Sequence, residues 1–204
     1  MKITKELLRE KGACAAGYRD FLKEFQEEKY PDGVEYQDLL DCCAEKNFSY
    51  GSWLLSEFGR TDDVRRIDGD LITKKSIIFA GRLEVSGIIK AGWGIEAGEG
   101  IKAGKGIEAG KGIEAGEGIE AGEGIKAGWG IKAGKGIKAG WGIKAGWGIE
   151  AGEGIKAGWG IEAGCEFGIY AGLRVRITSE YRKIIAKTKP ENIMCGEFVE
   201  AENE

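Results

Sequence analysis

The chain has 204 residues, of which 36 are glycine and none is histidine, and its 30 basic and 34 acidic side chains leave a formal net charge of −4. Without imidazole there can be no Ser-His-Asp or Cys-His nucleophile system and no His-ligated zinc site. The small net charge gives no general attraction to nucleic acid or to anionic membranes. The length suits one domain, or a small domain fused to a larger one.

The first ten residues are too charged for a signal peptide, and no stretch approaches the ~18 apolar residues that span a bilayer. Five cysteines are spaced irregularly with no C-x-x-C pair, which is not typical of a disulfide framework or a structural zinc site. We therefore expect a cytoplasmic protein with reduced, packed thiols and no membrane partner. Cys42 and Cys43 share a helical stripe with Leu39 and Leu40, so we expect them to pack in a core.

Residues 1–66 contain few glycines and show the apolar spacing of helices. The pattern predicts helices from Thr4 to about Lys11, from Ala13 to about Glu28, from Glu35 to Lys46 and from Ser49 to Phe58. Stacked-strand proteins leave unpaired strand edges at their ends, and these must be covered. We interpret 1–66 as a helical N-terminal cap domain.

From Ile89 to Gly160 the chain repeats Ile-x-Ala-Gly-x-Gly in twelve uninterrupted hexads. A six-residue period does not fit a helix, but it places Ile and Ala on one face of a short strand and the Glu or Lys between them on the other. The Gly-x-Gly supplies residues that can take a positive φ, which we expect the corners to require. The repeat predicts a mainly β protein, a parallel β-solenoid over residues 67–177. The register continues backward to Leu83, Ile77 and Leu71 and, after a two-residue slip, forward to Ile169.

One coil can contain three hexads, which gives a triangular prism with a period of 18, or two hexads, which gives a flattened coil with a period of 12. Sorting by 18 favours the prism, because one column then holds no Trp and all five Trp of the repeat fall in the other two. We expect about five to six coils, rising ~4.8 Å each. The solenoid's handedness stays open.

After the repeat, Leu173 to Ile177 alternates like a strand. Two further apolar runs, 182–188 and 193–199, flank Lys189-Pro190-Glu191-Asn192 and predict a β-hairpin. We interpret 178–204 as a C-terminal strand and hairpin cap with a frayed tail.

Three sequence segments resemble the repeats of bactofilins, which are polymer-forming cytoskeletal proteins with a triangular β-helix. These segments are Ile67-Asp-Gly-Asp-Leu71, Gly81-Arg-Leu-Glu-Val-Ser-Gly87 and the repeated Gly-Ile-x-Ala. The resemblance covers about half the chain and implies a structural, polymer-forming role. Bactofilins usually carry disordered tails instead of a helical head, and their repeats are less uniform. The hexads are also similar to those of hexapeptide-repeat acyltransferases, whose catalytic His has no counterpart in this sequence.

Candidate interaction residues stand at the variable positions of the hexads. Ile and Ala already fill the interior, so the Trp at position five must lie outside, where they either form a partner surface or cover the glycine backbone as a stacked ladder. These residues are Trp93, Trp129, Trp141, Trp147 and Trp159.

Charge is divided along the repeat. Residues 96–123 carry seven Glu against three Lys, and 126–159 carry six Lys against two Glu, so two prisms laid antiparallel would match acid to base. The charged residues assigned to the interaction surface are Glu96, Glu99, Glu114, Glu117, Glu120, Glu123, Lys126, Lys132, Lys135, Lys138 and Lys144.

The sequence thus predicts a non-enzymatic scaffold that self-associates, as a dimer or polymer, through its Trp- and charge-bearing faces, or that binds another protein. We expect no catalytic, cofactor or metal site and no direct binding of nucleic acid. The alternative is a binding inhibitor of a nucleic-acid-processing or defence protein, of the kind found in phages and mobile elements, in which the acidic half partly mimics a phosphate backbone.

Overall fold

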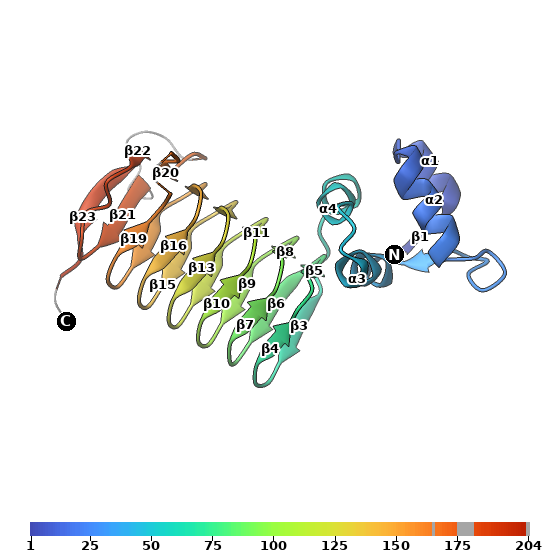
Figure 1. Ribbon diagram of the computed structural model, residues 1–204, viewed down its shortest axis with the longest axis horizontal. Helices are drawn as coiled ribbons and strands as arrows, with labels where there is room; N and C mark the ends of the chain where they lie inside the picture. The colour runs from blue at the N-terminus through green and yellow to red at the C-terminus, as the bar shows by residue number, and fades with distance from the viewer. Residues whose placement is uncertain (165, 175–181, 203–204) are drawn as a thin grey trace.

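The computed structural model describes residues 1–164, 166–174 and 182–202. It is an elongated molecule in which three parallel sheets form the sides of a β-solenoid, with helices beyond one end (Figure 1). The sheets have six, seven and eight strands, and we call them the six-strand, seven-strand and eight-strand faces. The solenoid has about seven turns, more than expected, because strands on both sides of the predicted range join it.

The strands are short and lie in parallel stacks. The six-strand face contains β4 (Leu71–Thr73), β7 (Ile89–Ala91), β10 (Ile107–Ala109), β13 (Ile125–Ala127), β16 (Ile143–Ala145) and β19 (Ile161–Glu162). The seven-strand face contains β5 (Ile77–Phe79), β8 (Ile95–Ala97), β11 (Ile113–Ala115), β14 (Ile131–Ala133), β17 (Ile149–Ala151), β20 (Ile169–Ala171) and β22 (Ile193–Cys195). The eight-strand face contains β3 (Val64–Ile67), β6 (Arg82–Val85), β9 (Ile101–Ala103), β12 (Ile119–Ala121), β15 (Ile137–Ala139), β18 (Ile155–Ala157), β21 (Lys183–Ala186) and β23 (Glu197–Glu200).

Each strand of the repeat pairs in register with the equivalent strand of the next coil, and the 18-residue periodicity confirms three hexads per coil. Ile107, for example, lies over Ile89 and under Ile125, and Ala109 aligns with Ala91 in the same way. These Ile and Ala side chains are buried in one continuous core, while the residue between them points outward. The slip before Ile169 is also confirmed, because Ile169 pairs with Ile149, two positions beyond the regular spacing.

The corners use glycine for a different reason from the one expected. None of the glycines in the twelve hexads has a positive φ, so that expectation is wrong. A Cβ on the first glycine of a Gly-x-Gly corner would instead fall inside contact distance of a backbone carbonyl in the previous coil, as at Gly122 against the oxygen of Gly104. At the second glycine, such as Gly124, the nearest atom would be 3.4 Å away. Close approach of backbones between coils therefore selects the first glycine.

The N-terminal region folds into four helices, as predicted; each begins one or two residues later than expected, and the first two also end earlier. They are α1 (Lys5–Glu10), α2 (Ala15–Glu24), α3 (Tyr36–Lys46) and α4 (Gly51–Phe58). A small antiparallel pair, β1 (Lys2–Ile3) with β2 (Val34–Glu35), closes the domain and was not predicted. The helices bury their own core around residues such as Phe21, Leu40 and Leu54.

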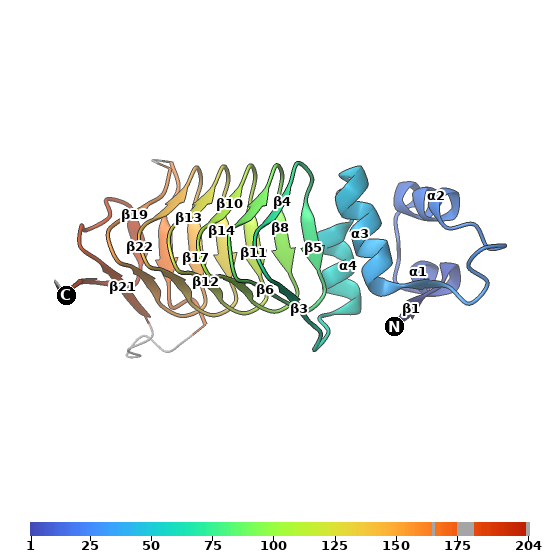
Figure 2. The ribbon, with the colours of Figure 1, turned by 90° about the horizontal axis from the view of Figure 1, so that it is seen from below.

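Helices α3 and α4 lie against the β5 end of the solenoid (Figure 2). Gln37 donates from Nε2 to the carbonyl of Ile78 (2.9 Å), and its Oε1 accepts from the N–H of Ala80 (3.0 Å). Ile78 points outward from β5 but is buried because Gly51 of α4 packs directly on it. The helical domain thus covers this strand edge, as a cap should. The solenoid itself begins at β3, a few residues earlier than position 67.

The predicted C-terminal hairpin is wrong. Strands form in both predicted segments, but β21 pairs parallel with β18, β22 with β20 and β23 with β21, so the chain continues to coil. This arrangement places Ile184 and Ile193 over inward isoleucines of the previous coil and satisfies the strand edges there, which a separate hairpin would leave unpaired. The predicted strand at 173–177 lies largely outside the described residues.

The two glycines of one corner should respond differently to alanine. We expect Gly122→Ala to lower the free energy of unfolding by about 2–3 kcal/mol more than Gly124→Ala does, because only the first added methyl meets backbone that cannot move aside. Chemical denaturation followed by circular dichroism measures both values. Equal losses would show that close approach between coils does not select the first glycine.

Candidate protein-interaction surfaces

The five Trp of the repeat lie outside the core, at two of the three corners. The first corner, between the six-strand and seven-strand faces, carries Trp93, Trp129 and Trp147. The third corner, between the eight-strand and six-strand faces, carries Trp141 and Trp159. All five are exposed, from 39% for Trp93 to 68% for Trp159. The partner surface predicted from these residues is therefore divided into two separate strips.

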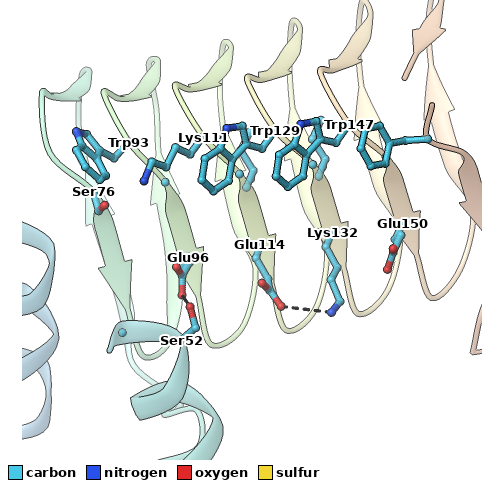
Figure 3. Close-up of a pocket in the computed structure, with 18 of the residues that line it drawn as sticks. Ser52, Ser76, Trp93, Glu96, Lys111, Glu114, Trp129, Lys132, Trp147 and Glu150 are labelled. Carbon is cyan, nitrogen blue, oxygen red and sulfur yellow. Dashed lines mark hydrogen bonds and ion pairs between the residues drawn. The ribbon is translucent and has the colours of Figure 1, made fainter. Parts of the chain in front are cut away.

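The first corner forms a continuous ladder of side chains along the solenoid (Figure 3). The rings of Trp129 and Trp147 are parallel, with centroids 4.9 Å apart, and Phe167 extends the stack with its centroid 5.6 Å from that of Trp147. Lys111 lies between two rings, with Nζ 3.8 Å from the centroid of Trp93 and 4.8 Å from that of Trp129. An ammonium group therefore replaces the missing ring by cation–π attraction.

The coil spacing sets this stack. Corner residues are linked by backbone hydrogen bonds, such as the N–H of Trp147 to the carbonyl of Trp129 (3.2 Å), so successive side chains repeat at the distance between strands. The stacking expected of a ladder is thus present at Trp129 and Trp147. Because neighbouring rings cover one another's faces, the ladder presents ring edges to solvent and suits a protein surface better than a flat ligand stacking on a ring face.

A groove with a volume of about 900 Å³ runs beside this ladder over the seven-strand face. Its floor carries the outward residues Glu96, Glu114, Lys132 and Glu150 (Figure 3). Residues of α4 and the turn before it line one end, and Tyr170, Asn192 and Met194 line the other. The groove is therefore walled on one side by aromatic rings and floored by charged groups, mostly acidic.

Glu96 lies where α4 meets this groove. The Ser52 hydroxyl of α4 donates to its Oε2 at 2.8 Å. Burial raises the pKa of Glu96 above its ordinary value; the hydrogen bond from Ser52 opposes this effect, and the nearby charge of Glu114 adds to it. Glu96 therefore serves the junction between the helical domain and the solenoid, which the sequence did not reveal.

Glu99 and Glu117, at the second corner, between the seven-strand and eight-strand faces, are also used within the chain. Glu117 accepts from Lys135 at 3.0 Å, from Arg60 at 3.1 Å and from Arg82 at 3.2 Å, and Glu99 lies 3.7 Å from Arg82. The hydrogen bond from Lys135, with the charges of Lys135, Arg60 and Arg82, lowers the pKa of Glu117. Since Arg60 follows α4, this cluster ties the helical domain to the solenoid, and its carboxylates are less available to a partner.

The acidic and basic halves are partly matched inside the chain, between adjacent coils. Glu114 pairs with Lys132 at 3.7 Å, and Glu120 lies between Lys102 and Lys138 at 4.0 and 3.7 Å. On the six-strand face two more pairs form, Lys90 with Glu108 at 2.8 Å and Lys144 with Glu162 at 2.7 Å. These pairs are exposed, and each contributes about 0–1 kcal/mol.

The third corner borders a shallow depression of about 650 Å³ on the six-strand face. Trp141 and Glu123 line its edge, and Lys126 and Lys144 lie on its floor. Trp159, the most exposed of the five Trp, has Lys187 Nζ 5.7 Å from its ring centroid. The structure thus brings Glu123 and Lys126 together here, away from the ladder.

Sequence reasoning missed Lys111 and Phe167 in the ladder, and Lys90, Glu108 and Glu162 on the six-strand face. The 18-residue column that contains Trp93 and Trp129 could have identified Lys111, which falls midway between them in the sequence. Phe167 follows the two-residue slip and breaks that spacing. The expectation of packed thiols is confirmed for Cys43, which is buried and whose pKa burial raises to about 12. Cys42 and Cys195 are only half-buried, and Cys14 is exposed, so the expectation is wrong for Cys14.

Comparison with known proteins describes only the helical domain. Residues 1–61 match the family described as the YdhT N-terminal domain, which is less than a third of the chain. No curated protein and no solved structure matches the chain. Across the described residues, no cluster of three or more His, Cys, Asp or Glu side chains could hold a metal ion, and no helix has the length and apolar character needed to cross a membrane.

The effect of replacing Glu96 on stability should depend on pH, because this carboxyl group is buried. Because its folded pKa is raised, the charged carboxylate opposes folding above that pKa, and the penalty disappears as pH falls below the ordinary value of 4.5. We expect Glu96→Gln to raise the melting temperature by a few degrees at neutral pH and to have no such effect in acid. Glu150→Gln, on the same face and exposed, is the control and should change little. A destabilised Glu96→Gln variant at neutral pH would contradict this account.

The stacked indoles should give a coupled circular dichroism signal. We expect Trp129→Phe and Trp147→Phe each to abolish it, because the parallel pair is lost, while Trp159→Phe on the third corner leaves it unchanged. Far-ultraviolet difference spectra at matched concentration measure this. A signal that survives both ladder variants would contradict the stack.

Proposed function

We propose that this protein is a non-enzymatic scaffold that self-associates side by side through the Trp- and charge-bearing faces of its solenoid. The observation that carries the proposal is the arrangement of exposed charges of both signs in straight rows along flat faces, with one charge at each coil of the six-strand face from β7 to β19. A second copy with the same spacing can match such rows over their whole length. We also propose a cytoplasmic location, which the free thiols of Cys14, Cys42, Cys43 and Cys195 favour.

The end of the solenoid favours lateral over end-to-end association. The resemblance to bactofilins suggests polymers, which strands can build by stacking at exposed edges. Here α3 and α4 cover the edge at β5, so stacking another solenoid there would require the helical domain to move. We therefore propose that copies meet along their sides and that the ladder groove remains available for a different protein.

The alternative is a binding inhibitor that partly mimics nucleic acid. The seven-strand face and the second corner together gather six Glu against two Lys within the perfect hexads, which is the observation in its favour. Arg60, Arg82 and Lys135 neutralise part of that charge. Replacing Glu114, Glu150 and Glu153 together by Gln should abolish inhibition of DNA cleavage in host extract if the alternative holds. Extract that cleaves equally well with the unmodified chain would refute it.

Self-association should be strong at low salt and weak at high salt. We expect sedimentation equilibrium to show a dimer at micromolar concentration in low salt, shifting toward monomer as salt screens the exposed charges. A monomer at all concentrations in low salt would overturn the proposal. An association that salt does not weaken would show that charged rows do not drive it.

A further inference from the structure

We propose that the six-strand face is a dimer interface, on which a second copy of the chain lies antiparallel with β13 of both copies at the twofold axis. The inference rests on the proposed self-association and names its face and register. It follows from the order of charges, from what covers the other faces and from the position of the helical domain.

The outward residues of the six-strand face form a self-complementary row. In order from β7 to β19 they are Lys90, Glu108, Lys126, Lys144 and Glu162. When the second copy runs in the opposite direction, β7 faces β19 and β10 faces β16. Lys90 then meets Glu162 and Glu108 meets Lys144, each twice by symmetry, while Lys126 meets its own equivalent once. Four contacts join opposite charges and one joins like charges.

The ion pairs within each chain strengthen this match. Lys90 already pairs with Glu108, and Lys144 with Glu162, along the axis. In the dimer one such pair lies against the other in reverse order, so each of these four residues has an opposite charge beside it and another across the interface. The side chains of these four residues are 44–66% exposed and so are free to make the second contact.

The other two faces match less well. When every charged position of the eight-strand face is paired, four contacts again join opposite charges. However, Arg66 then meets Lys156 twice, which joins like charges. In this register β21 and β23 also project toward the helical domain of the second copy. On the seven-strand face, two contacts would join opposite charges and two would join like charges. Moreover, α4 lies over its first strands through Gly51 and Ser52.

The antiparallel register on the six-strand face avoids this collision. With β13 on the axis, β4 of one copy lies level with the last coil of the other, and each helical domain projects beyond the end of its neighbour. At the rim the same register brings Trp141, which borders the depression, opposite Lys105 of the second copy, and it brings Glu123 opposite its own equivalent, a second contact between like charges. The contact area is on the order of 400–500 Å² per copy, near the lower limit for a specific interface, so we expect micromolar and salt-sensitive binding.

Charge swaps that keep each pair within the chain test the inference. Variant one exchanges Lys144 and Glu162 (Lys144→Glu with Glu162→Lys), and variant two exchanges Lys90 and Glu108 (Lys90→Glu with Glu108→Lys). Each keeps the net charge and its ion pair within the chain but makes all four interface contacts repulsive. We expect each to raise the dimer Kd about tenfold or more, measured by sedimentation equilibrium at low salt.

Recombining the swaps should restore binding. The chain that carries both exchanges has opposite charges across the interface again, and so does an equimolar mixture of the two variants. We expect both to return to within about twofold of the unmodified Kd, an outcome that a misfolded variant cannot give. Lys126→Ala should tighten the dimer, because it removes the like-charge contact at the axis.

The matched control exchanges Glu114 and Lys132, an ion pair on the seven-strand face, and should leave the Kd unchanged. If the unmodified chain dimerises but the two six-strand swaps have no effect, or if the mixture binds no better than each variant alone, this interface is wrong while self-association stands. If the unmodified chain stays monomeric, the proposed function is wrong as well.

Discussion

The structure depends on how closely the backbones of neighbouring coils approach at the first glycine of each corner. A side chain there would enter the space of a carbonyl group in the coil before it, as at Gly122 and Gly104. With glycine in place, the corner N–H bonds to the coil below and every strand of the repeat stacks in register on its equivalent in that coil. The solenoid, its buried Ile and Ala core and its flat faces all follow from this packing.

Because the strands stack in register, equivalent positions of successive hexad triplets form straight rows on the surface of the solenoid. Equivalent residues of neighbouring coils lie about one strand spacing apart on the surface, close enough for indoles to stack and for Lys and Glu to pair. The ladder of rings, in which Lys111 occupies the place of a missing ring, and the ion pairs between adjacent coils on the faces are two consequences of one geometry. Because the rows are straight and the faces flat, a second copy with the same spacing can match them charge by charge.

Much of this could be read from the sequence. The hexads predicted the solenoid, the three-hexad coil and the outward Trp, and the apolar spacing of residues 1–66 predicted the helical cap. The glycine corners were misjudged because a repeat shows where glycine stands but not whether φ or close packing demands it. The prediction of a C-terminal hairpin was wrong because the last strands lack the Ile-x-Ala-Gly-x-Gly pattern, although Ile184 and Ile193 still align with the core. The burial of Glu96 beneath Ser52 depends on contact between domains, which local pattern does not contain.

The central claim is that this chain works as a rigid rod that associates along its side. Small-angle X-ray scattering on the unmodified protein, recorded at low and high salt, tests it most directly, because it reports length and cross-section together. The account predicts that at low salt the cross-section of the solenoid part grows toward that of two rods side by side, while the maximum dimension increases by about the length of one helical domain and does not double, and that high salt returns the single rod. A particle that roughly doubles in length at constant cross-section, or one that remains a single rod at low salt, would contradict it.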